Sequence, residues 1–398
     1  MRTCEKNRKK EHSGCEVVKI NMMNKKIHPS EWIVQALVII PAFLLIAAVL
    51  FFMGCDNKET APISEEAFWQ GIDAYVTARM DPNGSGYGLL VVQDGRILFG
   101  KGWGMANIAD GFPFTPDTPI DLASLTKQFT AVAILILYER DSLDLEEKIV
   151  DHFPEFPAAW SDVTVHHLLT HQSGIPNYTE LVPESAAGYD GLTNQTAMER
   201  VLRNSSLEFP PGEQTRYSNT GYLILAMLVE KISKKSYSDF LEETIFGPLN
   251  MESTFVHDET SVLPPNSALP YDENNRLYDY EWYAYGASGI YSTLNDMFQW
   301  DQALYTDSII SQSTLQLATT GYTGGENNFG YGWMVGSYRG YPSYRHGGFC
   351  LGLLNYIYRV PGKNFMYLML SNGGVFANDG FDTWTDEVKD RIFAHCLQ

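Results

Sequence analysis

Ser124 and Lys127 are the two residues whose types and spacing point most directly to chemistry. They form the only Ser-x-x-Lys sequence in the chain. If a helix begins at or just before Ser124, residues three apart lie on one face of it, so the Lys127 amine can reach the serine hydroxyl. The pair would then be a nucleophile beside its base. A serine that caps a helix, followed by a solvated lysine, would give the same spacing without chemistry.

The apolar residues that follow Lys127 favour the catalytic interpretation. Residues 129–137 are almost all apolar, which predicts a helix that is buried nearly all round and has a polar first turn. A lysine removed from water there loses proton affinity and can act as a base at neutral pH. The start of the helix also leaves backbone N–H groups unpaired beside Ser124, and one of them can form half of an oxyanion hole.

A second candidate segment contains Tyr217 and Asn219, the only Tyr-x-Asn sequence in the chain. It follows a turn at residues 209–212, and in an extended backbone both side chains point the same way. A phenol beside an ammonium group would have a lowered pKa and could shuttle protons. A core tyrosine with a satisfied hydroxyl is the alternative.

A third candidate segment, His346-Gly347-Gly348, opens a strand-like run. Paired glycines let another backbone or a ligand approach closely, as a strand facing Ser124 across a cleft requires. His346 can hydrogen-bond or carry charge there, and the N–H of Phe349 can complete the oxyanion hole. A strand bulge with a surface histidine is the alternative.

The elements that must position these residues lie at both ends of the chain and in its middle. Residues 65–80 show helical spacing, and two strand-like runs flank Asp94-Gly95, a strong hairpin signal. Strands are expected at residues 87–92, 96–103, 330–334, 346–353, 355–359 and 365–371. Further helices are expected at residues 143–153, 165–169, 194–203, 222–232, 239–245, 295–304 and 384–396. The pattern predicts an α+β fold: an antiparallel sheet built from N- and C-terminal segments and flanked by helices, plus an all-helical lobe.

Taken in this order, the three segments resemble the three motifs of the serine β-lactamase and penicillin-binding-protein superfamily, which are Ser-x-x-Lys, a second polar triplet and a strand triplet. The tyrosine in the second segment is similar to that of class C β-lactamases, D-Ala-D-Ala carboxypeptidases, D-aminopeptidases and related esterases. The resemblance continues through residues 168–174 and 209–212 and covers residues 64–397.

The resemblance implies a role for each matching residue. Ser124 would attack a carbonyl, and Lys127 and Tyr217 would exchange the proton. Asn219 would orient the substrate or the lysine. The backbone amides of Ser124 and Phe349 would hold the oxyanion.

The third segment departs from the family pattern. His346 stands where β-lactamases typically have lysine, and Gly347 stands where a hydroxyl residue would contact a β-lactam carboxylate. Gly348 matches the family glycine. The departure argues against antibiotic hydrolysis and leaves acyl transfer intact, because neither replaced group is the nucleophile or its base.

The N-terminal part carries a membrane signal. Residues 32–53 contain no charged residue and are long enough to cross a bilayer, and Lys25 and Lys26 precede them. The run ends at Gly54-Cys55, which resembles a bacterial lipoprotein signal with Cys55 as the lipidated residue; an uncleaved anchor helix is the alternative. We therefore expect a membrane-targeting segment at 1–55, a linker at 56–63 and a hydrolase domain at 64–398, outside the cytoplasm on the bacterial cell envelope.

Composition limits which partners and cofactors are expected. The net charge of -20 argues against a nucleic-acid partner, which would require clustered cations. The five cysteines show no metal-ligand spacing, and we expect neither a metal nor a cofactor. Sequence positions alone leave open whether Cys350 and Cys396 are paired, and two small buried side chains are the simpler interpretation.

These observations predict an enzyme, a serine hydrolase that forms an acyl-enzyme with an ester, amide or β-lactam carbonyl. Its partner would be a small-molecule or peptide acyl substrate, including peptidoglycan fragments. A D-Ala-D-Ala carboxypeptidase or D-aminopeptidase-type peptidase is one alternative. A catalytically silent envelope protein that binds peptidoglycan is another. The sequence leaves the oligomeric state open.

Overall fold

The computed structural model describes residues 64–325, 327–373 and 381–398. Glu65–Gln398 form one compact unit. In these ranges no helix is both long and apolar enough to cross a membrane. The predicted membrane segment at residues 32–53 and the predicted lipidation site Cys55 lie outside the described residues.

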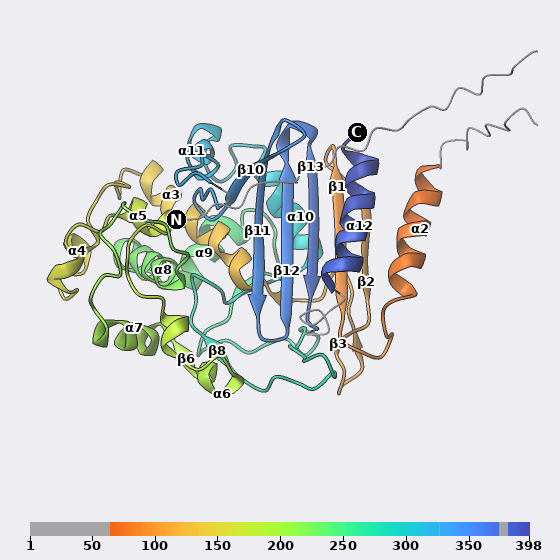
Figure 1. Cartoon of the computed structure of the whole chain (residues 1–398), viewed down its shortest axis with the longest axis horizontal. Coiled ribbons are helices and arrows are strands. Elements are labelled where there is room, and N and C mark those ends of the chain that lie inside the picture. Colours follow the sequence, from red (N-terminus) through yellow and green to blue (C-terminus); the bar gives the residue numbers. More distant parts are fainter. Residues whose placement is uncertain (1–63, 326, 374–380) are drawn as a thin grey trace, which may run out of the picture. The chain divides into compact units, whose positions relative to one another are not determined.

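A six-stranded antiparallel sheet brings the two ends of this unit together (Figure 1). Its order is β10-β11-β12-β13-β1-β2, so the N-terminal hairpin pairs with the last strand of the chain. The strands are β1 (Tyr87–Gln93), β2 (Arg96–Trp103), β10 (Met334–Tyr338), β11 (Tyr341–Cys350), β12 (Leu353–Val360) and β13 (Phe365–Ser371). The predicted α+β fold, with its sheet built from both ends of the chain, is confirmed.

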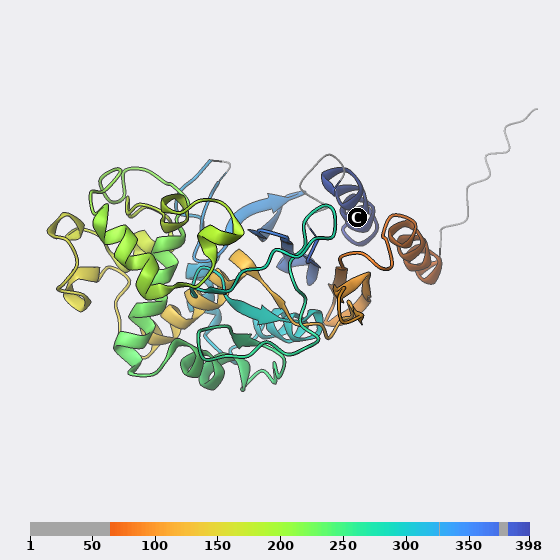
Figure 2. The ribbon, with the colours of Figure 1, turned by 90° about the horizontal axis from the view of Figure 1, so that it is seen from below.

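The sheet has an apolar core on each face, because successive side chains of a strand point to opposite sides. Leu89 and Val91 of β1 pack against the terminal helices α2 (Glu65–Thr77) and α12 (Phe381–Cys396). Leu90 and Val92 belong to the larger core on the other face, which includes α10 (Leu294–Ala303). Figure 2 shows the strands between α12, in dark blue, and α10, in cyan.

The helical lobe is built around two buried helices, α3 (Lys127–Glu139) and α8 (Asn219–Ser233). Its other helical segments are η1 (Ala123–Thr126), α4 (Ile149–His152), η2 (Ala158–Trp160), α5 (Val165–Leu169), η3 (Tyr178–Leu181), α6 (Ala186–Tyr189), α7 (Asn194–Arg203), α9 (Tyr237–Leu241) and η4 (Glu242–Phe246). The remaining elements are β3 (Met105–Asn107), β4 (Phe112–Pro113), β5 (Ile120–Asp121), β6 (Leu192–Thr193), β7 (Phe255–Val256), β8 (Trp282–Tyr283), β9 (Ile290–Ser292), α11 (Gln312–Ala318) and η5 (Pro361–Lys363).

The strand boundaries around β10 and β11 differ from the prediction. The strand expected at residues 330–334 begins only at Met334, and β11 begins at Tyr341, so His346 lies inside the strand rather than at its start. Arg339 (φ 49°) and Gly340 (φ 87°) form the hairpin turn between them. An arginine is not a residue typical of such a turn, and for this reason the sequence did not reveal the hairpin.

Three helices also differ from the prediction. Only Ile149–His152 of residues 143–153 is helical, because the preceding backbone pairs with residues 163–166, as in the hydrogen bond from His166 N to Leu145 O (2.7 Å). The helix expected at 222–232 begins earlier, at Asn219. The helix expected at 239–245 consists of α9 followed by a π-helical turn, Glu242–Phe246.

Candidate active site

The Lys127 amine is the centre of the polar contacts around Ser124. A short 3-10 turn, η1, carries Ser124 and leads into α3, whose first residue is Lys127. Nζ lies 3.2 Å from Ser124 Oγ. It also donates to two oxygens, Asn219 Oδ1 at 2.8 Å and the backbone oxygen of Ala287 at 2.9 Å. Both of these are acceptors only, so two of the amine hydrogens are committed to them.

Burial favours the uncharged form of this amine. Lys127 is completely buried, and burial lowers its pKa well below the ordinary lysine value. A neutral amine has two hydrogens and one lone pair. In that form both hydrogens can be donated to Asn219 Oδ1 and Ala287 O, which leaves the lone pair free to accept the Ser124 proton, as a general base beside a nucleophile requires.

Tyr217 lies close to the same amine. Lys127 Nζ is 4.8 Å from the centre of the Tyr217 ring. The Tyr217 hydroxyl is buried and forms no hydrogen bond with the described residues. Burial raises its pKa well above the ordinary tyrosine value. The predicted lowered pKa of Tyr217 is therefore wrong, because burial disfavours the charged phenolate form.

His171, which sequence reasoning did not assign to the site, holds the Tyr217 segment in place. The imidazole is buried and packs on the Tyr217 ring, with 4.5 Å between ring centres. Its Nδ1 accepts a hydrogen bond from Ser218 N (3.2 Å), and its backbone oxygen accepts one from Arg216 N (2.9 Å). Burial lowers the pKa of His171 well below its ordinary value, so the ring is neutral.

The backbone of His171 explains why the sequence did not single it out. His171 has a φ of 59°, an uncommon conformation for a residue other than glycine. It directly follows α5 and turns the chain toward Gly174. In the sequence, only the resemblance of residues 168–174 to the family pointed to this region.

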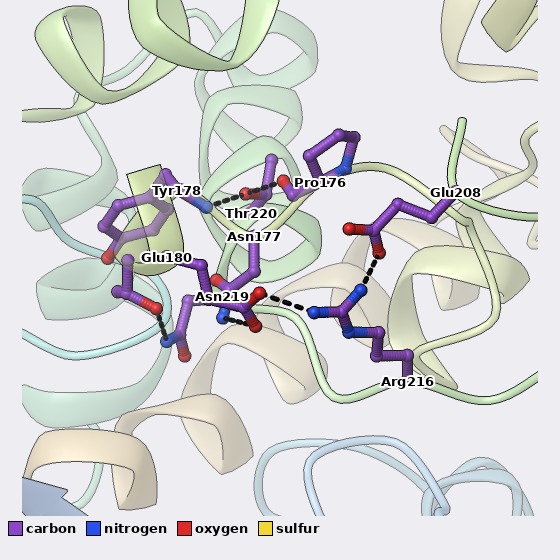
Figure 3. A network of polar contacts seen from close by, with 9 residues as sticks. Pro176, Asn177, Tyr178, Glu180, Glu208, Arg216, Asn219 and Thr220 are labelled. Carbon is purple, nitrogen blue, oxygen red and sulfur yellow. Dashed lines mark hydrogen bonds and ion pairs between the residues drawn. The ribbon is translucent and has the colours of Figure 1, made fainter. Parts of the chain in front are cut away.

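Asn219 is held in place by a neighbouring loop, as Figure 3 shows. Asn219 is the first residue of α8 rather than part of an extended segment, and its N–H donates to Asn177 Oδ1 (3.1 Å). Thr220 Oγ1 donates to Pro176 O (2.7 Å) and accepts from Tyr178 N (2.8 Å). Side chains on two segments far apart in sequence thereby fix the amide oxygen that Lys127 contacts.

Arg216 extends the same network of polar contacts to the surface. Its guanidinium pairs with Glu180 of the loop and with Glu208, the latter at 2.7 Å (Figure 3). All three side chains are at least partly exposed, so the pairs contribute about 0–1 kcal/mol each to stability. They link the residues before Tyr217 to the loop that contacts Asn219.

Strand β11 passes close to the turn that carries Ser124. A Cβ placed on Gly348 would lie 2.5 Å from Leu122 O, closer than any side chain allows, whereas a Cβ on Gly347 would meet nothing. Close approach therefore requires glycine at 348 but not at 347, because the two residues face opposite sides of the strand.

His346 lies on the same side of β11 as Gly348. It is buried rather than on the surface, and its Nδ1 lies 2.6 Å from Gly347 O. A carbonyl can only accept, so Nδ1 carries the proton and Nε2 is left as an acceptor. Burial lowers the pKa of His346 to about 4, with the nearby Lys127 adding to the effect, so the imidazole is neutral at pH 7.

The part of β11 that follows Arg345 has one open edge. β10 pairs with β11 only as far as Met334 opposite Arg345, so residues 346–350 pair with β12 alone among the described strands. Phe349 lies on this segment with its side chain 60% exposed, and it lines the same pocket as Ser124.

Asp121, which sequence reasoning also missed, holds the turn before Ser124. Its Oδ1 accepts hydrogen bonds from Ala123 N (2.8 Å) and Gly289 N (3.3 Å). Ala123 has a φ of 48°, a strained value for alanine, which the hydrogen bond from its own N–H helps to maintain. Burial raises the pKa of the Asp121 carboxyl to about 6.

A pocket of about 200 Å³ opens beside Ser124. It is lined by Ala123, Ser124, Tyr178, Thr179, Glu184, Tyr189, Asn219, Trp282, Ala287, Ser288, Phe349, Cys350 and Leu351. Aromatic residues from the helical lobe, from β8 and from β11 form part of its wall. The pocket therefore has room for a small acyl group next to the serine hydroxyl.

The described residues contain no group of His, Cys, Asp and Glu side chains that could hold a metal ion. Cys350 and Cys396 are both free thiols and only partly buried. The two cysteines are not paired, in agreement with the simpler interpretation, although both are only partly buried.

Comparison with known proteins identifies relatives of this chain by sequence. The chain matches the family model described as Beta-lactamase over residues 72–389. It is 33% identical to penicillin-binding protein 4* of Bacillus subtilis over 276 residues, which are 62% of this chain and 59% of that protein. It is 25% identical to a D-aminopeptidase of Gluconobacter oxydans over 298 residues, 73% of this chain and 56% of that protein. The matched segments thus span little more than half the length of these curated relatives.

Two solved structures show the same fold. The D-amino acid amidase from Ochrobactrum anthropi, in complex with L-phenylalanine amide, has a TM-score of 0.70 at 25% identity, with 83% of this chain and 99% of that chain covered. The octameric penicillin-binding protein homologue from Pyrococcus abyssi has a TM-score of 0.68 at 27% identity, with 77% of this chain and 75% of that chain covered.

Proposed function

This chain belongs to the beta-lactamase family of serine hydrolases, and from that premise we propose that it hydrolyses a carbonyl substrate through an acyl-enzyme on Ser124. One observation carries the proposal. The Lys127 amine lies 3.2 Å from Ser124 Oγ, and its two acceptors, Asn219 Oδ1 and Ala287 O, can take both hydrogens of its neutral form, which leaves the lone pair for the serine proton. A structural lysine would have no reason to present a lone pair to a serine.

Acylation begins with attack by Ser124 Oγ on the substrate carbonyl carbon. The hydroxyl proton passes to Lys127 Nζ as the new C–O bond forms. The leaving group departs with a proton from the Tyr217 hydroxyl, which is then replaced by the proton held on Lys127. A water molecule then attacks the carbonyl carbon of the acyl-enzyme, and the bond to Ser124 Oγ breaks. The water proton returns to Ser124 Oγ through Tyr217 and Lys127, so the acid is released and the enzyme regains its starting protonation state.

The oxyanion of the tetrahedral intermediate needs backbone donors. The Ser124 N–H at the start of the helix and the Phe349 N–H on the open edge of β11 are the two groups that we assign to it. Gly348 allows that edge to approach the Ser124 turn, and Asn219 orients the lysine.

The proposed substrate is an ester or amide, handled with the lysine and tyrosine pattern of class C-like members. A β-lactam is a weaker candidate, because His346 is neutral and Gly347 offers no hydroxyl to a carboxylate. Two similar proteins, a D-aminopeptidase and a D-amino acid amidase, make a D-amino-acid-specific peptidase or amidase the second candidate. A silent peptidoglycan-binding protein would not need the contacts that Lys127 makes.

We propose that the enzyme acts outside the cytoplasm on the bacterial envelope, where peptidoglycan fragments would be available to it. This proposal rests on the uncharged residues 32–53 and on Cys55, which would attach the hydrolase domain at 64–398 through a linker at 56–63. Mass spectrometry of the membrane fraction tests it. A diacylglyceryl group on Cys55 is expected, and an unmodified Cys55 in an intact N-terminus would exclude the lipoprotein form.

A fluorescent fluorophosphonate probe tests the catalytic proposal. Labelling of the purified protein is expected, and Ser124→Ala should remove it. Lys127→Ala should slow labelling about 10²- to 10⁴-fold because the base is missing. Equal labelling of Ser124→Ala and the parent would refute the nucleophile. Near-normal labelling of Lys127→Ala would instead give the role of base to Tyr217 alone.

A further inference from the structure

The electrostatics of the pocket beside Ser124 narrow the substrate class. We propose that this pocket selects substrates that carry a positively charged ammonium group, with the Glu184 carboxylate as its counter-ion. The inference rests on the proposed function, because it concerns which substrates reach the acylation step.

Among the described residues that line this pocket, Glu184 is the only Asp, Glu, Lys, Arg or His. Burial raises the pKa of the Cys350 thiol to about 11 and raises the pKa of both Tyr178 and Tyr189, so all three are neutral. Two basic groups lie behind the pocket and are not among its lining residues. Burial lowers the pKa of His346 to about 4, so it is neutral at pH 7, and burial disfavours the charged form of Lys127.

The Glu184 carboxylate has no partner among the described residues, with which it forms neither a hydrogen bond nor an ion pair. Its neighbours in the same region differ. Glu180 and Glu208 are both paired with Arg216, whose charge is thereby already used. An unpaired carboxylate on the rim of a pocket attracts cations and repels anions.

The walls of the pocket favour the same kind of ligand. Tyr178, Tyr189 and Trp282 line it, and the Tyr189 and Trp282 rings are in contact, with 4.8 Å between their centres. Aromatic faces attract ammonium groups as well as apolar side chains. A carboxylate and aromatic rings on one pocket thus suit an amine attached to an aromatic or aliphatic group.

The same features disfavour anionic substrates. A β-lactam carboxylate or the terminal carboxylate of a peptide would enter a pocket that contains a negative charge and no cation among its described lining residues. The free amino group of an aminoacyl ester or amide has the opposite charge and would be retained. The charge of the pocket would therefore favour hydrolysis of aminoacyl esters and amides over carboxypeptidase and β-lactamase activity at this site.

Three phenylalanine methyl esters, identical except at nitrogen and each used as the D and the L isomer, provide the test at about pH 6. The free amine is largely cationic there, since this pH lies well below the pKa values of about 7.7–8.0 of ordinary α-amino groups. The N-acetyl ester is neutral and the N-succinyl ester is anionic. The measured quantity is the ratio of kcat/KM for the free amine to kcat/KM for the succinyl ester, which cancels any general loss of activity.

The parent enzyme should prefer the free amine. Glu184→Gln should reduce the ratio about 3- to 10-fold, near the upper end for an exposed charge pair, and Glu184→Lys should reduce it further or invert it. Glu155→Gln is the matched control, because Glu155 is also exposed and unpaired among the described residues but does not line the pocket. Its ratio should equal that of the parent.

The outcomes separate the two proposals. Fluorophosphonate labelling of Ser124 reports the acylation machinery without any ammonium group. If Ser124 is labelled and Glu184→Gln leaves the ratio unchanged, or if none of the esters is hydrolysed, the charge selection is wrong and the proposed function stands. If Ser124 is not labelled, both proposals fail together.

Discussion

Lys127 and Asn219, joined by a 2.8 Å hydrogen bond from Nζ to Oδ1, are the first residues of α3 and α8. The N-terminal ends of two buried helices therefore meet at one amine. The positive ends of both helix dipoles disfavour a charge on that amine, in the same direction as burial. The contact thus combines positioning with electrostatic tuning of the base.

Replacement of Asn219 by aspartate should raise the pKa of Lys127. A carboxylate at hydrogen-bond distance stabilises the ammonium form by about 1–3 pKa units. Since only the neutral amine is a base, the acidic limb of the pH profile for Ser124 labelling should move to higher pH by a similar amount. Asn83→Asp, an exposed change, is the control. An unshifted limb for Asn219→Asp would mean that Lys127 does not set that limb.

Tyr217→Phe should separate catalysis from stability. The Tyr217 hydroxyl is buried without a hydrogen-bond partner among the described residues, so its removal should leave the free energy of unfolding unchanged or slightly higher. Loss of the proton donor should lower kcat about 10²-fold or more. Urea unfolding and ester turnover measure the two quantities. A marked loss of stability would instead identify Tyr217 as a structural core residue.

The two glycines of β11 should respond differently to alanine. In Gly348→Ala the new methyl group would collide with Leu122 O beside the Ser124 turn, which should lower the free energy of unfolding by about 1–3 kcal/mol and slow labelling of Ser124. Gly347→Ala meets nothing and should unfold like the parent. Similar urea midpoints for the two variants would contradict the close approach of β11 to the turn.

Asp121→Asn should change how stability depends on pH. The pKa of Asp121 is raised to about 6 in the folded protein, above its unfolded value, so the folded state binds more protons between about pH 4 and 6. The contribution of Asp121 to stability therefore falls as pH rises through this window, by at most about 3 kcal/mol. Asparagine does not titrate, so the free energy of unfolding of Asp121→Asn relative to that of the parent should increase from pH 4 to pH 7.

Urea unfolding of both proteins at the two pH values measures this difference. The same variant retains an Oδ1 acceptor for Ala123 N, so labelling of Ser124 should persist, whereas Asp121→Ala should impair it. A pH-independent difference in stability would show that Asp121 does not titrate in this range.

Local sequence signals predicted the framework of the site. The Asp94-Gly95 turn, in which both residues have positive φ, identified the first hairpin from backbone preferences alone. The apolar run after Lys127 predicted a buried helix and, with it, a buried amine. Periodicity and turn chemistry depend on neighbours in sequence, and for that reason these features are readable without a structure.

Long-range contacts could not be read in this way. His171 and Asp121 act on Tyr217 and Ser124 through hydrogen bonds to backbone groups that no residue pattern announces. Glu184 is recognised as an unpaired carboxylate only once Arg216 is seen to pair with two other carboxylates. Each of these relationships depends on which distant segments the fold brings together.

The sequence by itself determined that Ser124 and Lys127 share one face at a helix start, because a spacing of three residues allows little else. The tertiary structure decided which protonation states are favoured for Lys127 and its neighbours. Burial favours the uncharged forms of Lys127, His346 and Tyr217, since transfer from water disfavours every charged form. That desolvation comes from the surrounding fold, which a motif does not contain.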